Sequence, residues 1–157
     1  MQPLLEQVRA RIPARNVPLD FWQIDAGPLI LDGFMDLSSV LMLCDLREEE
    51  VPKGYAMLAY LFDWEAQCQS DGWGAFGNTP LPVFARICHF YRAVGLVDEA
   101  TSLMAQMAAF QNDPEDREGM QEALDSTRHE LSGDLDRMEY LTQYFCDHTT
   151  ELLYEQV

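Results

Sequence analysis

The chain has 157 residues, 48% of them hydrophobic, and its 27 acidic and ten basic side chains give a formal net charge of −17. This length and apolar content fit one globular domain that buries most of its apolar surface. No run of about 18 apolar residues is present, so we expect no membrane-spanning helix. The N-terminus lacks a basic start followed by an apolar run, so we expect no secretory signal and a cytoplasmic protein.

The negative charge is concentrated toward the C-terminus. Residues 98–157 hold 15 acidic and three basic side chains, and the only lysine of the chain is Lys53. A surface with this charge repels nucleic acid and anionic lipid head groups, and it attracts cationic partners at long range. The sequence therefore argues against direct binding of nucleic acid or membrane. Solubility alone and attraction of a basic partner both stay open as explanations.

The first third of the chain predicts two helices with proline-rich and charged connections. In chain order these are a short amphipathic helix over 2–12, an irregular connection over 17–27, a long helix over 29–46 and a charged turn over 47–54. The long helix is apolar nearly all round, which predicts that it is buried.

The stretch over 55–110 predicts a packed core of three helices. The first and third have apolar residues at three- and four-residue spacing, which places these residues on one helical face. The inward residues are expected to be Met57, Leu58, Leu61, Trp64 and Cys68 in the first helix, and Leu96, Ala100, Leu103, Met104, Met107 and Phe110 in the third. The middle helix, over 81–94, is expected to be capped by Asn78 or Thr79 and to end at Gly95.

Residues 72–77 spell G-x-G-x-x-G. A dinucleotide site needs a buried strand before this motif and a helix N-terminus that faces the phosphates. The preceding segment instead has helical periodicity, Asp71 would repel a pyrophosphate, and no lysine follows in the chain. We therefore interpret the segment as a structural loop that binds no nucleotide, with Trp73 and Phe76 folded back onto the core.

The C-terminal third is predicted to hold an acidic turn and two further helices. The turn over 112–118 opens a helix for which Asp113 is the expected cap. In the last helix, which starts near Asp134, a rotation of about 100° per residue separates two faces. The inward face holds Leu131, Leu135, Met138, Thr142, Phe145, Thr149 and Leu152, and the outward face holds Asp136, Glu139, Asp147 and Glu151 without interleaved lysines. A solvated face and a face that meets a basic partner both explain this pattern.

The sequence offers little catalytic chemistry. The four cysteines lie far apart in helical segments, which is typical of buried, reduced thiols. They are Cys44, Cys68, Cys88 and Cys146. His89 follows Cys88, but adjacent helical residues diverge by about 100°, so the two cannot share a metal. No motif of a serine hydrolase, a zinc protease or a redox dithiol is present, and we expect no enzyme, metal or cofactor.

Glu65 is the one carboxylate with a suggestive position, close to Trp64 and the glycine-rich segment. We favour the interpretation that it accepts hydrogen bonds from backbone amides of that segment. The alternative is a pocket that Glu65 forms together with Trp73 and Phe76.

Several short patterns follow one another in the second half of the chain. They are Tyr60-Leu61-Phe62-Asp63-x-Glu65, Gly72-Trp73-x-x-Phe76-x-Asn78, Val94-Gly95 before a helix that ends at Phe110, and more loosely Leu135-Asp136-Arg137-Met138-Glu139-Tyr140. Together they resemble a family of bacterial DNA-mimic proteins over about residues 55–155. The sequence departs from that family where Ser70-Asp71-Gly72 stands for Asn-Gly-Gly, where Ala75 replaces a frequent Gln, and where one residue is inserted after Glu65.

The resemblance implies an all-helical bundle and, for the best-known member, binding of a transcription regulator through a DNA-like array of carboxylates. It also implies structural roles for the motif residues Glu65, Gly72, Trp73, Phe76, Asn78 and Gly95.

We therefore predict an all-α fold, a single-domain irregular bundle of about six to seven helices over residues 1–157. The predicted function is non-enzymatic binding of a basic protein surface, such as the DNA-binding groove of a regulator, with a homodimer left open. The candidate contact residues are Asp113, Glu115, Asp116, Glu118, Glu122, Asp125, Asp136, Glu139, Asp147 and Glu151. The alternatives are a small-ligand-binding or catalytic protein with a pocket near Glu65, Trp73 and Phe76, and a protein that binds its partner through an exposed apolar patch.

Overall fold

Helices form all the regular structure that the computed structural model describes, which covers residues 28–43, 48–50, 52–131 and 133–153. The helices are α2 (Pro28–Met42), a 3-10 turn η2 (Glu48–Glu50), α3 (Lys53–Asp71), α4 (Gly74–Asn78), α5 (Leu81–Ala93), α6 (Val97–Asn112), α7 (Arg117–Asp125), α8 (Asp134–Asp147) and α9 (Thr149–Leu153). No strand occurs in these ranges, so the predicted all-α fold class is confirmed. Within the same ranges, every helix is too short or too polar to cross a lipid bilayer.

The boundaries of several elements differ from the prediction. The helix expected over 29–46 is α2, which ends at Met42. The charged turn expected over 47–54 contains η2, and α3 begins inside it at Lys53. The helix expected over 2–12 and the connection expected over 17–27 lie outside the described residues.

The chain divides into two compact units, one formed by residues 1–63 and 138–157 and the other by residues 64–137. The helices α3 and α8 each contribute to both units, because the chain passes between the units at residues 63–64 and 137–138. The single domain over 1–157 stays a prediction.

An aromatic cluster forms the core of the first unit. Phe34 of α2 stacks on Phe62 of α3 with ring centroids 5.5 Å apart, and Phe145 of α8 lies within 6.0 Å of both rings. All three rings are buried. Two buried hydrogen bonds also join helices of this unit. The Ser38 hydroxyl donates to the Ala59 carbonyl, and the Tyr55 hydroxyl donates to the Leu153 carbonyl. The aromatic cluster thus joins α2, α3 and α8, and the Tyr55 bond adds α9.

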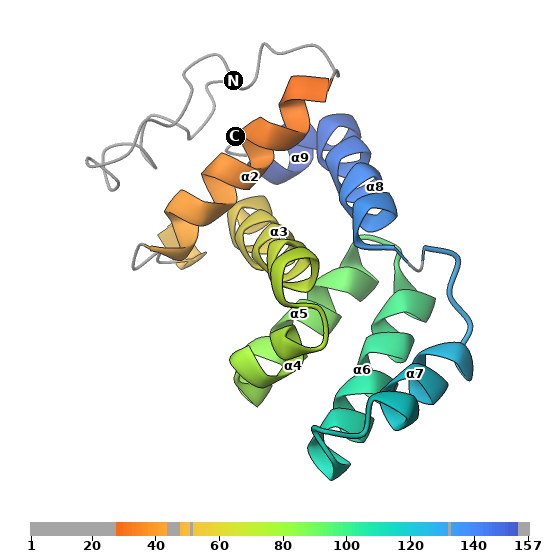
Figure 1. Ribbon diagram of the computed structural model, residues 1–157. Coiled ribbons are helices and arrows are strands. Elements are labelled where there is room, and N and C mark those ends of the chain that lie inside the picture. The colour runs from red at the N-terminus through yellow and green to blue at the C-terminus, as the bar shows by residue number, and fades with distance from the viewer. Residues whose placement is uncertain (1–27, 44–47, 51, 132, 154–157) are drawn as a thin grey trace. The chain divides into compact units, whose positions relative to one another are not determined.

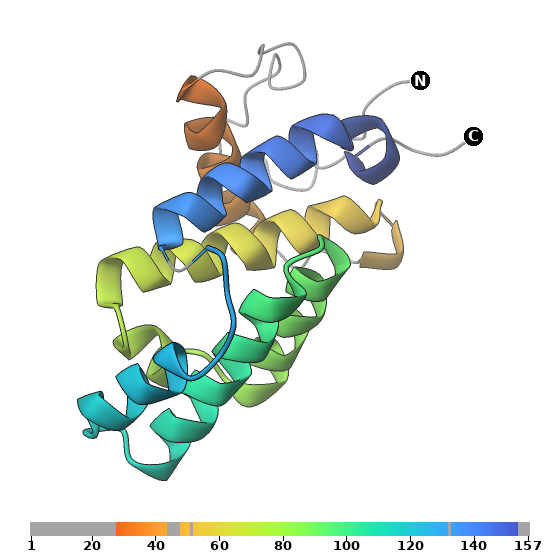
Figure 2. The same cartoon turned by 90° about the vertical axis from the view of Figure 1, so that its right-hand side faces the viewer.

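Trp64 is the centre of the second unit. Its ring, fully buried at the middle of α3, meets Phe76 of α4 and Phe84 of α5 edge-on, with centroids 5.2 and 5.4 Å away. Phe76 also stacks on Phe110 of α6 at 6.2 Å. The helix α6 packs against both α5 and α7, as Figures 1 and 2 show. The burial predicted for Trp64 and Phe76 is confirmed.

Two residues predicted to face the core are exposed. Met104 is 49% exposed, because it lies at the edge of the contact between α6 and α5, where it lines an open pocket with residues of α5. Its sulfur accepts a hydrogen bond from Arg92. Leu135 is 52% exposed, because Arg137 occupies the inward position in the first turn of α8. The prediction was wrong at both positions, since it assumed one apolar stripe for each helix.

Gly95 ends α5 in the way that the sequence predicts. Its φ of 90° lies in the left-handed region. The Gly95 amide donates to the Arg92 carbonyl and the Leu96 amide donates to the Tyr91 carbonyl, which is the Schellman arrangement. The N-terminal cap differs from the prediction. The N-cap is Pro80, and Thr79 instead donates its hydroxyl to the Ala75 carbonyl.

Replacing Gly95 with alanine is expected to lower the free energy of unfolding by about 1–2 kcal/mol, because a Cβ is disfavoured at this φ. Gly95→Asn should lower the free energy of unfolding by less than Gly95→Ala, since asparagine tolerates the left-handed region better than alanine does. Urea denaturation of the two variants beside the wild type measures both values. Equal stability of Gly95→Ala and wild type would contradict the Schellman ending.

Candidate functional site

Glu65 and Arg137 form a buried ion pair within the second unit. Glu65 lies on α3 and Arg137 lies in the first turn of α8, and the Nε of Arg137 donates to Oε1 of Glu65 at 2.8 Å. Their side chains are 0% and 11% exposed. Arg137 also donates from a terminal nitrogen to the Leu131 carbonyl at 3.3 Å. The expectation that Glu65 accepts from backbone amides of the glycine-rich segment is wrong, because its Oε1 accepts from Arg137 and its Oε2 has no partner among the described residues.

The surroundings of Glu65 set its protonation near neutral pH. Burial raises the pKa of Glu65 from its ordinary 4.5 to about 7, although the charge and the hydrogen bond of Arg137 oppose this rise. The charge of Asp134 raises the same pKa further. For Arg137, burial lowers the pKa, but the neighbouring Glu65 outweighs burial and the net shift is upward. Arg137 therefore stays charged while Glu65 gains or loses its proton around pH 7.

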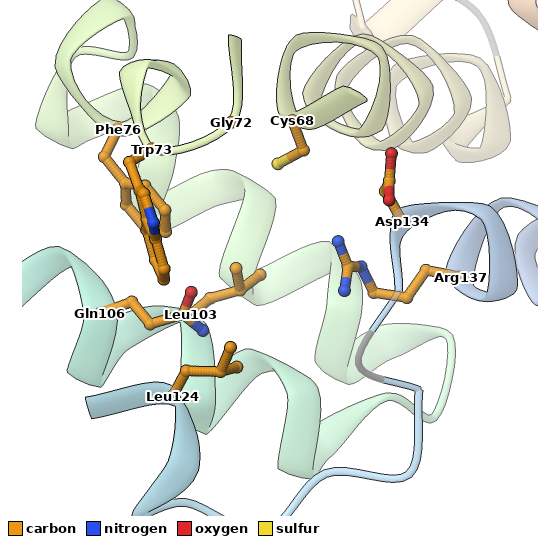
Figure 3. A pocket seen from close by; sticks show the side chains of 9 residues that line it. All are labelled: Cys68, Gly72, Trp73, Phe76, Leu103, Gln106, Leu124, Asp134 and Arg137. Atoms are coloured by element: carbon orange, nitrogen blue, oxygen red, sulfur yellow. The ribbon is translucent and has the colours of Figure 1, made fainter. Parts of the chain in front are cut away.

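A cavity of about 200 Å³ lies in the same unit, beside Arg137. Trp73 and Phe76 line one side of it, and Figure 3 shows the guanidinium group of Arg137 pointing into the space from the opposite side. Its remaining lining residues are Cys68, Gly72, Leu103, Gln106, Leu124 and Asp134. The cavity thus has an aromatic wall and a cationic wall.

The thiols of the described residues are unbridged, as predicted. The predicted burial is confirmed for Cys88 and is wrong for Cys68 and Cys146, which are half-buried. Burial raises the pKa of the Cys68 thiol well above its ordinary value and raises that of Cys88 to about 11. These thiols are protonated at neutral pH and are weak nucleophiles. Cys44 lies outside the described residues.

The glycine-rich segment is largely helical, which corrects the prediction of a loop. After Gly72, whose φ is 55°, one helical turn forms α4 and buries Ala75 and Phe76. Asn78 ends that turn and donates its amide to the Asp71 carboxylate at 3.1 Å. The element before Gly72 is the helix α3, so the strand that a dinucleotide motif needs is replaced by a helix. The absence of nucleotide binding stays a prediction.

The ten candidate carboxylates of the acidic surface are all exposed. Six of them lie in the turn before α7 and in α7 itself, which we call the α7 acidic segment: Asp113, Glu115, Asp116, Glu118, Glu122 and Asp125. The other four are Asp136, Glu139, Asp147 and Glu151, in α8 and α9. Asp136 belongs to the second unit, whereas the last three belong to the first. The α7 acidic segment is therefore the larger group within one unit.

Three side chains of the α7 acidic segment have local structural roles. Asp116, and not Asp113 as predicted, is the N-cap of α7, and its carboxylate accepts from the Gly119 amide at 2.9 Å. Asp113 accepts from the Glu115 amide one turn earlier. Asp125 accepts from the Gln121 side chain. Aspartate is a preferred N-cap residue at either position, and the tight turn over 113–116, in which the Asp116 amide donates to the Asp113 carbonyl, makes Asp116 the cap.

Ion pairing differs between the two groups of carboxylates. No carboxylate of the α7 acidic segment forms an ion pair with a residue that the structure describes. Glu151 lies 3.5 Å from Lys53 and 3.5 Å from His148. No lysine is interleaved along this helical face, but the single lysine of the chain approaches Glu151 from α3.

Within the described ranges, no group of three His, Cys, Asp or Glu side chains is arranged to hold a metal ion. Comparison with known proteins gave no matching family model, no matching curated protein and no matching solved structure.

Proposed function

We propose that the protein is an acidic, non-enzymatic module that binds a basic protein surface, as a DNA mimic binds the groove of a DNA-binding regulator. The observation that carries this proposal is the α7 acidic segment. Six exposed carboxylates lie within residues 113–125, and Arg117 is the only basic residue among them. Carboxylates without local counterions are suited to the lysines and arginines of a partner.

The positions of the carboxylates within α7 destabilise the isolated helix, which supports a role for them in binding a partner. Glu118 and Glu122 are four residues apart on one face, and like charges at this spacing cost about 0.2–0.5 kcal/mol. Asp125 lies in the last turn of the helix, where the macrodipole disfavours a negative charge. A basic partner would relieve both effects on binding. The family resemblance of the sequence supports the same class of partner.

A catalytic role for Glu65 is less well supported. Its side chain is 0% exposed, so a substrate does not reach the carboxylate in this conformation. The cavity of about 200 Å³ is also smaller than the roughly 300–1,000 Å³ that is usual for drug-sized ligands.

The proposal predicts that charge in the α7 acidic segment determines partner binding. The test variant combines Glu115→Gln, Glu118→Gln, Glu122→Gln and Asp125→Asn, and keeps Asp113 and Asp116 because they cap local amides. Its affinity for a partner retained from an extract of the producing cells should fall by about tenfold or more, since each exposed ion pair contributes about 0.2–1 kcal/mol. Wild-type binding should also weaken with salt, and duplex DNA should displace the partner.

A matched control removes the same charge from α8 and α9 through Asp136→Asn, Glu139→Gln, Asp147→Asn and Glu151→Gln. Its binding should fall less, because these changes affect only long-range attraction. Unchanged binding of the α7 variant at low salt would show that the segment is merely solvated. An equal loss in both variants would show that net charge, and not the α7 acidic segment, governs binding.

A further inference from the structure

The cavity beside Arg137 has the size and the chemistry of a site for a small organic acid. An apolar cavity of about 150 Å³ is large enough to hold benzene. At about 200 Å³, this cavity has room for one aromatic ring and a carboxylate. Figure 3 shows Trp73 and Phe76 on one side and the guanidinium group of Arg137 on the other, with Leu103 between them.

Arg137 is held in position by its protein contacts. Its Nε donates to Glu65 at 2.8 Å and a terminal nitrogen donates to the Leu131 carbonyl at 3.3 Å, so the guanidinium plane has two fixed points. A guanidinium group that is fixed in this way loses little conformational entropy when it binds an acceptor. The guanidinium group also stays charged at neutral pH, so it attracts the carboxylate of a ligand.

The affinity of the cavity for an anion depends on the charges around it, and therefore on the protonation of Glu65. The titratable groups that act on Glu65 are Arg137 and Asp134 of α8, and Cys68 of α3 is coupled to the same cluster as a neutral thiol. With Glu65 ionised, the two carboxylates outweigh the guanidinium and disfavour an anion. With Glu65 protonated, a ligand carboxylate takes over as the counterion of Arg137. Ligand binding and proton uptake by Glu65 are therefore linked.

We propose that this cavity binds a small aromatic carboxylate, with its carboxylate on Arg137 and its ring against Trp73 and Phe76, and that Glu65 takes up a proton on binding. In this site Glu65 is a positioning residue, since it is buried behind Arg137 and orients the guanidinium group. Leu124 of α7 lines this site, but none of the carboxylates of the α7 acidic segment does, and the site does not rest on the proposed function.

Isothermal titration calorimetry of the full chain with benzoate tests the proposal. Binding should be saturable and about tenfold weaker at pH 8 than at pH 6, because Glu65 passes from mostly protonated to mostly ionised in this interval while benzoate stays ionised. Benzylamine, a cation of the same size, should give no saturable heat. Absence of saturable benzoate binding at both pH values, or equal binding of benzylamine, would overturn the site.

Two variants separate the roles of the residues. Glu65→Gln imitates the protonated carboxyl, so benzoate should bind it equally well at pH 6 and pH 8. Trp73→Ala removes part of the aromatic wall, and it should weaken benzoate binding at both pH values by about tenfold, since an aromatic contact is worth about 1 kcal/mol or more. A pH dependence that persists in Glu65→Gln would overturn the role of Glu65. Unchanged affinity of Trp73→Ala, with helical circular dichroism intact, would overturn the placement of the ring.

Discussion

Replacing Arg137 with methionine is expected to lower the free energy of unfolding by about 2–4 kcal/mol at pH 8. The change leaves Glu65 buried without its cation and leaves the Leu131 carbonyl without a donor, and such unsatisfied groups cost about 1–3 kcal/mol each. Methionine fills much of the space of the arginine stem, so the loss reports polar contacts more than packing. Urea denaturation of variant and wild type at several pH values measures the effect.

The loss should be about 1 kcal/mol smaller at pH 6 than at pH 8. In the folded wild type Glu65 has its pKa raised from 4.5 to about 7, so its contribution to stability is fully present below about pH 4.5 and is lost as the pH rises through 7. At pH 6 Glu65 is mostly neutral with or without Arg137, and the missing cation matters less. At pH 8 the wild type holds an ionised pair, whereas the variant must keep Glu65 protonated at a cost of about 1.4 kcal/mol per pH unit.

Glu65→Gln is the matched control for this titration. It keeps the shape of Glu65 and an acceptor for Arg137 but has no proton to lose, so the stability of this variant should vary less between pH 5 and pH 8 than that of the wild type. Identical pH profiles of the two proteins would show that Glu65 does not titrate in this range. An Arg137→Met variant as stable as the wild type at pH 8 would contradict the buried pair itself.

Gly54→Ala is expected to be the most damaging addition of a single methyl group, with a loss of about 3 kcal/mol. A Cβ at Gly54 would lie 2.6 Å from the Cβ of Leu152 and 2.8 Å from its carbonyl carbon, and it would also collide with the carbonyl oxygen. These are backbone atoms and a Cβ, which cannot move aside as the end of a flexible side chain can. In an uncrowded helix, alanine is more stable than glycine by about 1 kcal/mol. A loss of stability in Gly54→Ala would therefore come from the close approach of α3 and α9.

Gly74→Ala provides the control for that prediction. Gly74 begins the short helix α4, and the nearest atom to a Cβ placed there is the Asp71 Cβ at an ordinary 3.4 Å. This variant should be as stable as the wild type or slightly more stable. Urea denaturation midpoints of the two variants, measured side by side, make the comparison. If Gly54→Ala matched Gly74→Ala, the contact of α3 with α9 would be wrong.

The parts of the fold that could be predicted are those set by local sequence. The apolar spacing of Leu58, Leu61 and Trp64 lies within one helix, so periodicity alone placed these residues in the core. The end of α5 at Gly95 was equally local, because it depends on one backbone conformation. Met104 and Leu135 were misplaced, since the burial of a helical face depends on which other helices cover it, and a single sequence does not specify that.

The candidate site could be predicted only in part, because a single sequence does not specify which helices pack together. Glu65 follows Trp64 in a helix whose neighbouring residues are buried, and a carboxylate in such surroundings signals a missing counterion. Its partner Arg137 lies 72 positions away, and no local pattern joins the two. Arg137 was assigned to neither face of the last helix and was named only within a family pattern. The carboxylates of the α7 acidic segment were found correctly as exposed groups, because charge and turn chemistry are local properties.

The division of the chain also orders the events of its synthesis on the ribosome. Residues 64–137 form one unit without interruption, so all residues of this unit are translated before residues 138–157 of the other unit. Translation of the other unit begins earlier and ends later. Its Phe34 and Phe62 pack against Phe145, and its Tyr55 donates to the Leu153 carbonyl, so these contacts form only after the later residues are made. Until residues 138–157 are translated, the apolar residues of α2 and of early α3 have no α8 or α9 to pack against. Nascent chains with such surfaces are the ones that chaperones bind, and translation stopped after Arg137 would release a product prone to aggregate.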